Sequence, residues 1–349
     1  MIRLETGQMT RSEPTTLEQV AARAGVSPGT ASRVLNGKNK ENRPAIAKRS
    51  DRIRRIALQL GYRPNAAARS ISRGRFRAVA FVTCGDLGID WYPISELNGI
   101  HAALDKLEWR LLFNELPASK INDSKLIPQL FRESAVDALI VNLLPSFTEN
   151  TVEYFEAQPL PCVWLNLKRD LRSVYPDDAG GAAMAVRWLA KRGHERIGYF
   201  SRLFSGSTHY SATDRFKGFF QTMKADGLSP HRHLELITDN LSVMPPVLER
   251  AELFLKTFPD SQAVLCYEFE EAICMMFAAQ RAGRRVPDDL EIVGFNEREI
   301  RGSSGLSIPT VIVPFQEVGR RAVEMVEKII DTGRLDVESI AVPYKSILV

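Results

Sequence analysis

Cysteine is scarce in this chain, with four residues among 349. The four are scattered and form no Cys-x-x-Cys pair, and Cys84, Cys162 and Cys266 stand in apolar stretches with the pattern of strands. A disulfide framework needs paired cysteines in an oxidising compartment. We therefore expect buried free thiols and a reducing compartment.

Long apolar runs are also missing. No run approaches the roughly 20 residues that cross a bilayer. The first residues, MIRLETGQMTRSEPTT, are polar and lack the apolar core of a secretory signal. The sequence predicts a cytoplasmic protein without a membrane partner.

The motifs of common catalytic sites are absent as well. There is no Walker loop, no Gly-x-Ser-x-Gly, no His-Glu-x-x-His and no Gly-x-Gly-x-x-Gly after a strand. The five histidines form no metal pattern with the cysteines, and the pair His231-x-His233 lies in a polar stretch. An enzyme, a cofactor and a bound metal are therefore not expected.

Charge is present but unevenly distributed. Residues 1–77 hold 17 Lys and Arg against 5 Asp and Glu, a net charge of +12, and residues 78–349 carry a net charge of −8. A basic segment on an acidic body is typical of a phosphate-binding module joined to a globular domain. Apolar residues recur at helical spacing within the basic segment (Ile46, Ile53, Ile56), which favours a folded module over a disordered basic tail.

The stretch 16–37, TLEQVAARAGVSPGTASRVLNG, predicts two short helices joined by the turn Ala24-Gly25-Val26. Ser27 suits the N-cap of the second helix, which is expected to end near Leu35. Pro28 would occupy its first position, where a missing N–H costs nothing. Because a helix-turn-helix lays its second helix in the DNA major groove, the stretch predicts a DNA-binding head.

A third helix is expected from about Pro44 to Leu60, closed by Gly61. Pro64 then marks a joint, and the helix-prone segment 65–74 has too little apolar surface to fold without a partner. The expected organisation is a disordered tail over 1–14, a helix-turn-helix domain over 15–63, a hinge helix and linker over 64–76, and a body over 77–349.

From Arg77 onward, short apolar runs alternate with longer amphipathic ones. The alternation continues for about 270 residues, too many for one ordinary sheet, and predicts a two-lobed, doubly wound parallel α/β body with ligands bound beyond the carboxyl ends of strands. The expected strands are 78–82, 110–114, 138–142, 162–166, 196–200, 263–267 and 291–295; the expected helices are 94–107, 178–193, 211–227, 245–258 and 270–283.

Four stretches together resemble the lac repressor/galactose repressor family of bacterial transcription regulators: 16–37, LGYRPNAAARSI (60–71), VPDDLEIVGFN (286–296) and PFQEVGRRAVEMV (314–326). The resemblance implies a homodimer that reads a pseudo-palindromic double-stranded DNA operator. It also implies that 77–349 is an effector-binding and dimerisation domain, similar to periplasmic sugar-binding proteins, with a small-molecule effector between its lobes.

By this resemblance, Pro28, Gly29 and Arg33 read bases. Arg33 can fork onto guanine O6 and N7, whereas Pro28 and Gly29 offer only backbone and van der Waals contact. A phosphate contact or a solvated charge is the alternative for Arg33. The other head residues expected to serve as DNA contacts or helix caps are Thr16, Ser27, Thr30, Ser32, Asn36 and Tyr62.

The hinge segment carries the remaining expected DNA contacts, Asn65, Ala68, Arg69 and Ile71. Ile71 stands where the family usually has a leucine that wedges into the central base step. An isoleucine also supplies apolar bulk to replace lost stacking. Packing of Ile71 on its twin in the dimer is the alternative.

The resemblance also implies an effector site. Arg215 stands where the family has an arginine that clamps the effector, and Asn142 and Asn166 end strands in register with it; Glu268 and Asn296 complete the expected set. A salt bridge from Arg215 to Asp214 or Glu268 is the structural alternative, as is turn capping by the asparagines.

The cleft departs from the family pattern at three positions. Glu268 and Phe269 replace an Asn-Asp pair, Asn296 and Glu297 replace an Asp-Asp pair, and Val313 replaces a glutamine or arginine. Because an apolar replacement leaves a sugar hydroxyl unpaired, the cleft favours an effector that is less polyhydroxylated than a hexose or that carries a charge. A ligand-independent regulator with a degenerate cleft is the alternative.

Overall fold

The computed structural model describes residues 15–36, 44–63, 74–85, 94–117, 136–143, 149–201, 209–231, 246–298 and 307–349. The chain divides into two compact units, Met1–Phe76 and Arg77–Val349. The predicted tail over 1–14 and residues 64–73 of the predicted hinge lie outside the described residues.

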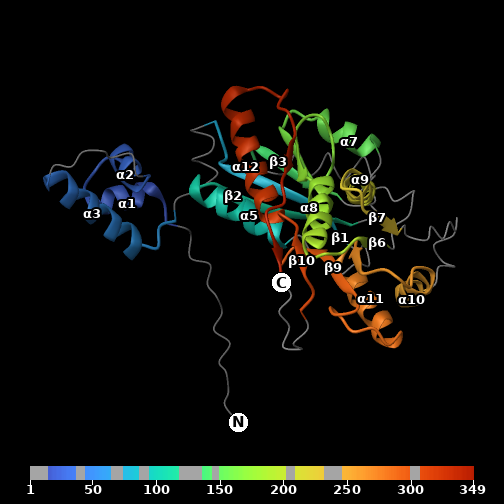
Figure 1. The fold of residues 1–349 in the computed structure, drawn as a ribbon. Helices are drawn as coiled ribbons and strands as arrows, with labels where there is room; N and C mark the ends of the chain where they lie inside the picture. Colours follow the sequence, from blue (N-terminus) through green and yellow to red (C-terminus); the bar gives the residue numbers. More distant parts are fainter. Residues whose placement is uncertain are drawn as a thin grey trace, which may run out of the picture. The chain divides into compact units, whose positions relative to one another are not determined.

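The first unit contains three helices, α1 (Leu17–Ala24), α2 (Pro28–Leu35) and α3 (Pro44–Gln59) (Figure 1). Gly25 forms the turn between α1 and α2 at φ +62°, a left-handed conformation that glycine adopts without steric cost. Apolar side chains from all three helices form one buried core, made of Val20, Ala21, Ala24, Ala31, Val34, Ile53 and Ala57. The predicted helix-turn-helix is confirmed.

The second unit contains two lobes, each built on a sheet that has six strands among the described residues. The first-lobe sheet has the order β11-β5-β4-β3-β1-β2, and the second-lobe sheet the order β12-β10-β9-β8-β6-β7. All paired strands are parallel except β10 and β12. The predicted fold class, a doubly wound parallel α/β body in two lobes, is confirmed.

The strand bounds follow from buried, β-branched-rich runs. The first-lobe strands are β1 (Ala78–Gly85), β2 (Arg110–Pro117), β3 (Ala138–Asn142), β4 (Cys162–Leu165), β5 (Ser173–Pro176) and β11 (Ile340–Val342). The second-lobe strands are β6 (Arg196–Phe200), β7 (Ser229–His231), β8 (Ala263–Cys266), β9 (Glu291–Asn296), β10 (Thr310–Ile312) and β12 (Ile347–Leu348).

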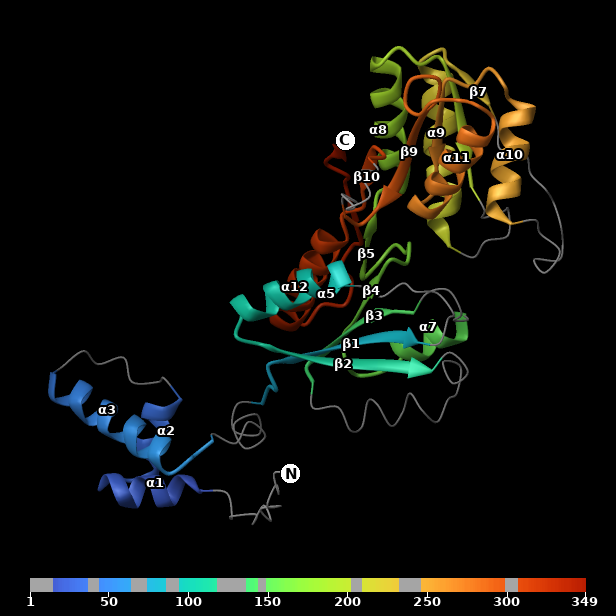
Figure 2. The ribbon, with the colours of Figure 1, turned by 90° about the horizontal axis from the view of Figure 1, so that it is seen from below.

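Helices cover both faces of each sheet (Figure 2). On the first lobe, α5 (Ile94–Lys106) and α12 (Phe315–Thr332) pack on one face and α7 (Glu149–Glu156) on the other. On the second lobe, α8 (Asp178–Lys191) and α9 (Tyr210–Ala225) lie opposite α10 (Val247–Thr257) and α11 (Phe269–Arg281).

The seven expected strands and five expected helices of the body are all present. The strands that the sequence pattern did not reveal are β5, β7, β10, β11 and β12, which have two to four residues each. So short a run carries too few alternations to separate a strand from a loop. The helices α7 and α12 were also not among the expected helices.

The chain passes between the lobes three times, from β5 to α8, from β10 to α12, and from β11 to β12. As a result, α12 and β11 complete the first lobe although they follow the second lobe in sequence.

The helices α5 and α12 approach each other closely through two glycines. A Cβ atom on Gly99 would collide with the backbone carbonyl of Gln316, and one on Gly319 would collide with the carbonyl of Glu96. Only glycine permits this backbone-to-backbone contact.

All four cysteines are free thiols, and Cys162 and Cys266 are buried. Burial raises the pKa of the Cys162 thiol, so it stays protonated. Among the described residues, no helix combines the length and the apolar character needed to span a bilayer.

Candidate DNA-binding and effector sites

The start of α2 is the exposed part of the head motif. Ser27, Pro28, Gly29 and Arg33 are exposed. Arg33 Nε donates to the Gly29 carbonyl at 3.4 Å, while the terminal nitrogens are the atoms that would fork onto a guanine. A Cβ atom on Gly29 would meet no atom within 4 Å, so this position has open space in front of it.

The remaining polar residues of the motif act as helix caps. The Thr16 side chain accepts a bond from the Gln19 N–H, and the Gln19 side chain accepts one from the Thr16 N–H. In the same way Ser27 Oγ accepts from the Thr30 N–H at 3.3 Å. These bonds satisfy backbone donors at the helix starts.

At the end of α2, Asn36 Nδ2 donates to Ser32 Oγ at 3.1 Å. Tyr62 is half-buried and packs against the core of the head. The predicted contacts Asn65, Ala68, Arg69 and Ile71 lie outside the described residues.

Arg215 is a buried residue of α9 in the second lobe, and its guanidinium bonds other groups of the protein. Its Nε donates to Asp178 Oδ1 at 2.6 Å and its Nη1 to the Tyr267 carbonyl at 2.6 Å. Tyr344 donates to the same Asp178 oxygen at 2.7 Å, and the guanidinium lies over the rings of Tyr267 and Phe295. The alternative that Arg215 pairs with Asp214 or Glu268 was wrong. Its ion-pair partner is Asp178 at the start of α8.

Asp214 instead pairs with Lys168 of the first lobe, a contact between the lobes. A second contact is made by Asn166, which follows β4 at φ +55°. Tyr210 donates its hydroxyl to Asn166 Oδ1 at 3.3 Å, and His209 Nε2 lies 3.1 Å from the Asn166 carbonyl. Burial lowers the pKa of His209, which favours the neutral imidazole. Asn166 therefore joins the lobes.

Asn142 ends β3 and is 1% exposed. Its Nδ2 donates to Glu96 Oε2 at 2.6 Å, and Glu96 is completely buried in the first turn of α5. Burial raises the pKa of Glu96 to about 8, the bond from Asn142 lowers it, and the charge of Glu297 raises it further. Glu96 was not among the expected site residues, since a glutamate on an amphipathic helix ordinarily faces water.

The other expected residues have separate roles. Glu268 is the N-cap of α11, and its backbone N–H donates to Glu271 Oε2. Asn296 ends β9 and donates to the Arg298 carbonyl at 2.8 Å. Val313 is 5% exposed and belongs to the second-lobe core. Asn142, Asn166 and Arg215 have different hydrogen-bond partners, which are Glu96, Tyr210 and Asp178 in that order.

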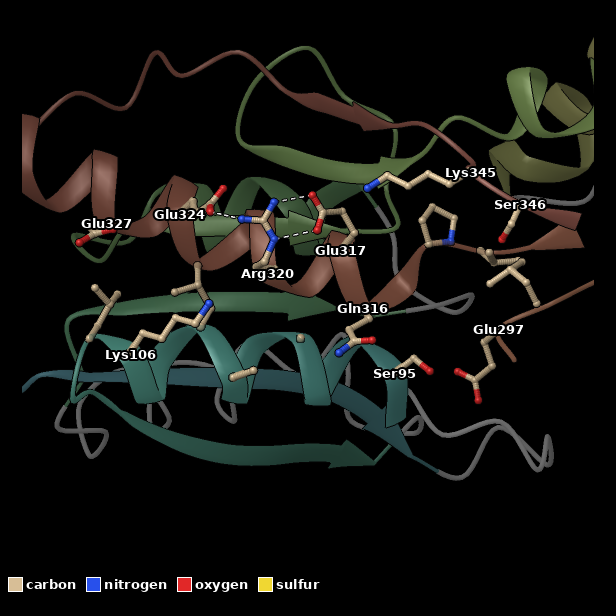
Figure 3. A pocket seen from close by; sticks show the side chains of 18 residues that line it. Ser95, Lys106, Glu297, Gln316, Glu317, Arg320, Glu324, Glu327, Lys345 and Ser346 are labelled. Carbon is tan, nitrogen blue, oxygen red and sulfur yellow. Dashed lines mark hydrogen bonds and ion pairs between the residues drawn. The ribbon is translucent and has the colours of Figure 1, made fainter. Parts of the chain in front are cut away.

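A groove of about 500 Å³ runs along α5 and α12 (Figure 3). Arg320 lies in its wall and bonds Glu317 and Glu324. The hydrogen bonds from Arg320 and Arg321 lower the pKa of Glu317 to about 2. Glu297 and Ser95 line the end of the groove nearest the crossover between the lobes. Among the described residues there is no cluster of three His, Cys, Asp or Glu that could hold a metal ion.

Two family models match this chain. The model for bacterial regulatory proteins of the lacI family matches residues 16–65, and the model for a periplasmic binding protein-like domain matches residues 186–348. The chain belongs to the lacI family. As a lacI-family protein it is a DNA-binding transcription regulator that carries a ligand-binding type of body.

Relatives and solved structures agree with the lacI assignment. The chain is 25% identical over 333 residues to catabolite control protein A of Priestia megaterium, covering 95% of this chain and 97% of the relative. It is 26% identical over 338 residues to the transcriptional regulator CelR of Thermobifida fusca, with 93% of each chain covered.

The fold is similar to that of a lac repressor dimer bound to operator and the anti-inducer ONPF, with a TM-score of 0.72, 20% identity, and 96% of this chain and 98% of the other covered. A structure of a CelR–cellobiose complex aligns with a TM-score of 0.62 and 22% identity, with the same coverage. At these identities the similarity shows the fold.

Proposed function

We propose that this protein is a homodimeric repressor whose operator affinity is controlled by a small molecule bound between the two lobes. The observation that carries the proposal is the exposed start of α2, held by a three-helix core within the segment that the lacI model matches. A lac repressor dimer of the same fold binds an operator, and CelR binds cellobiose, which supports both halves of the proposal.

The proposal also assigns roles in DNA binding to residues of the head and the hinge. Arg33 reads a base, Pro28 and Gly29 contact the groove wall, and Ile71 enters the minor groove at the centre of a pseudo-palindrome. The head spans 15–63 and the hinge 64–76. The protein acts in the cytoplasm, on chromosomal DNA.

Selection of bound sites from random duplex DNA tests the first half. With full-length protein and no ligand at about 0.15 M salt, we expect a pseudo-palindrome with a deformable central step. Recovery of unrelated sequences, with binding that simply fades as salt rises, would contradict sequence-specific reading.

Control by a ligand requires that the ligand bind one arrangement of the lobes more tightly than the other. The bonds from Lys168 to Asp214 and from Tyr210 to Asn166 cross between the lobes, so a change in the arrangement of the lobes would alter them. They are the groups through which ligand binding would shift the body.

A ligand-independent regulator is the second candidate, because Arg215 already has protein partners and Val313 is apolar. The double variant Lys168→Ala, Tyr210→Phe separates the two. If the lobes control the head, the variant shifts operator affinity severalfold; a ligand-independent regulator binds operator unchanged. The exposed-residue variant Lys224→Ala in α9 is the matched control.

A further inference from the structure

Hydrogen-bond acceptors outnumber donors where α5, β3 and β9 converge. Glu96 Oε2 accepts the bond from Asn142, and this leaves three oxygens that are buried and have no hydrogen-bond partner: Glu96 Oε1, Asn142 Oδ1 and Glu297 Oε2. Glu96 and Asn142 belong to the first lobe, and Glu297 follows β9 of the second. Buried acceptors normally find a donor, so this arrangement is incomplete.

Within the described part of the chain, no positive charge stabilises the carboxylate of Glu96. Glu96 is completely buried, and its ionisation is opposed by the charge of Glu297. The charges that shift the pKa of Glu96 include no cation, and Arg215 and Arg320 pair with other carboxylates, Asp178 in the first case and Glu317 and Glu324 in the second. Burying two carboxyl groups without a cation is costly.

We propose that the effector of this protein carries a primary ammonium group, which binds between Glu96, Asn142 and Glu297. This inference deepens the proposed function and rests on it. An ammonium group supplies three N–H donors and one positive charge, which matches three unpaired acceptor oxygens and two carboxyl groups. A sugar hydroxyl supplies one donor and no charge.

The position of the site suits control of the lobes. An ammonium bonded to Glu96 and Glu297 joins the first lobe to the second, and only an arrangement that brings both carboxylates together offers all three bonds. The groove lined by Glu297 provides space beside the site for the rest of the molecule.

Matched pairs of small molecules test the class of ligand by titration calorimetry with the full-length protein. Ethanolamine is compared with ethylene glycol, and glucosamine with glucose. We expect at least one amine to bind about tenfold or more tightly than its neutral counterpart. If no amine binds better than its counterpart at concentrations up to about 10 mM, or if potassium chloride binds equally well, the proposal is wrong.

Proton release gives a second measurement. Free Glu96 is mostly protonated at neutral pH, because burial raises its pKa to about 8, and a bound cation would ionise it. Binding enthalpies in buffers of different ionisation enthalpy should therefore show release of up to one proton. The isosteric variant Glu96→Gln should lose both the release and the preference for amines, and Glu297→Gln should lose the preference.

The exposed Glu195→Gln in the second lobe is the control and should behave as the unaltered protein. Retention of the amine preference by Glu96→Gln would overturn the inference. Operator binding measured on the same samples separates the two proposals: absence of a selected operator contradicts the proposed function, whereas operator binding combined with a preference for neutral ligands contradicts only the ammonium site.

Discussion

At the residue scale, Arg33 is the exposed side chain of α2 that can distinguish one base from another. Substitution Arg33→Ala should weaken operator binding by about 1–3 kcal/mol and relax the preference at one base pair of each half-site. Repeating the site selection with the variant measures both effects. Equal weakening on every DNA sequence would instead show that Arg33 contacts phosphate.

Both partners of the ion pair between Arg215 and Asp178 are buried. Arg215 is 7% exposed and Asp178 is 1% exposed. Arg215→Ala leaves the buried Asp178 charge with tyrosine hydroxyls but without the Arg215 cation, and the free energy of unfolding should fall by about 3–5 kcal/mol. The double variant Arg215→Met, Asp178→Asn should recover part of this loss in denaturant unfolding. No recovery would mean that the guanidinium matters through its ring contacts and its bond to the Tyr267 carbonyl.

Glu96 should make stability depend on pH. Its pKa is raised from 4.5 to about 8 in the folded protein, so between these values the folded state binds more protons than the unfolded state. The contribution to stability is present below about pH 4.5 and is lost as pH rises through about 8. Denaturant unfolding between about pH 5 and pH 8.5 should show a fall of a few kcal/mol that Glu96→Gln lacks. Parallel curves for the two proteins would contradict the buried acid.

At the element scale, the crossing of α5 and α12 depends on the absence of side chains. Gly99→Ala should lower the free energy of unfolding by about 1–3 kcal/mol, because the new methyl group collides with backbone that cannot move alone. The helix glycine Gly29 has open space instead, and Gly29→Ala should stabilise the head by up to about 0.5 kcal/mol. Denaturant unfolding checks both variants. A change of the same sign in the free energy of unfolding for both would contradict the packing difference.

The same elements show what the sequence could predict. The helix-turn-helix followed from local signals, since Ser27, Pro28 and Gly25 each prefer the backbone position they occupy. The buried strands followed from apolar composition. The edge strands β11 and β12 exist because of partners more than 30 residues away, and three residues of local sequence do not encode such a pairing.

The contacts within the candidate effector site were harder to predict from the sequence, for the same reason. Arg215 was predicted from its motif. Its partner Asp178 lies 37 residues earlier, and no sequence motif around Asp178 indicates the pairing. Glu96 and Asn142 are 46 residues apart, and only the fold brings them together. The contacts Asn65, Ala68, Arg69 and Ile71 stay predictions.

At the scale of the whole molecule, opposite charges are segregated along the chain, with +12 on residues 1–77 and −8 on residues 78–349. Binding of full-length protein to non-operator DNA should weaken about a thousandfold or more between about 50 and 200 mM salt, because counterions are released from phosphate. Filter binding or fluorescence anisotropy measures this slope. A separately produced Arg77–Val349 unit should bind DNA at no salt concentration in this range; binding by that unit would contradict the assignment of the phosphate contacts to the head.

The three passages of the chain between the lobes have a consequence for synthesis. The first lobe begins with β1 at residue 78, yet its core also needs α12 and its sheet needs β11, which ends at Val342. During synthesis on the ribosome, most of the second lobe is translated before α12 and β11, which the first lobe needs for its core and its sheet. During that interval the apolar face of α5 lacks the helix that covers it in the folded body, and such exposed apolar surface favours aggregation.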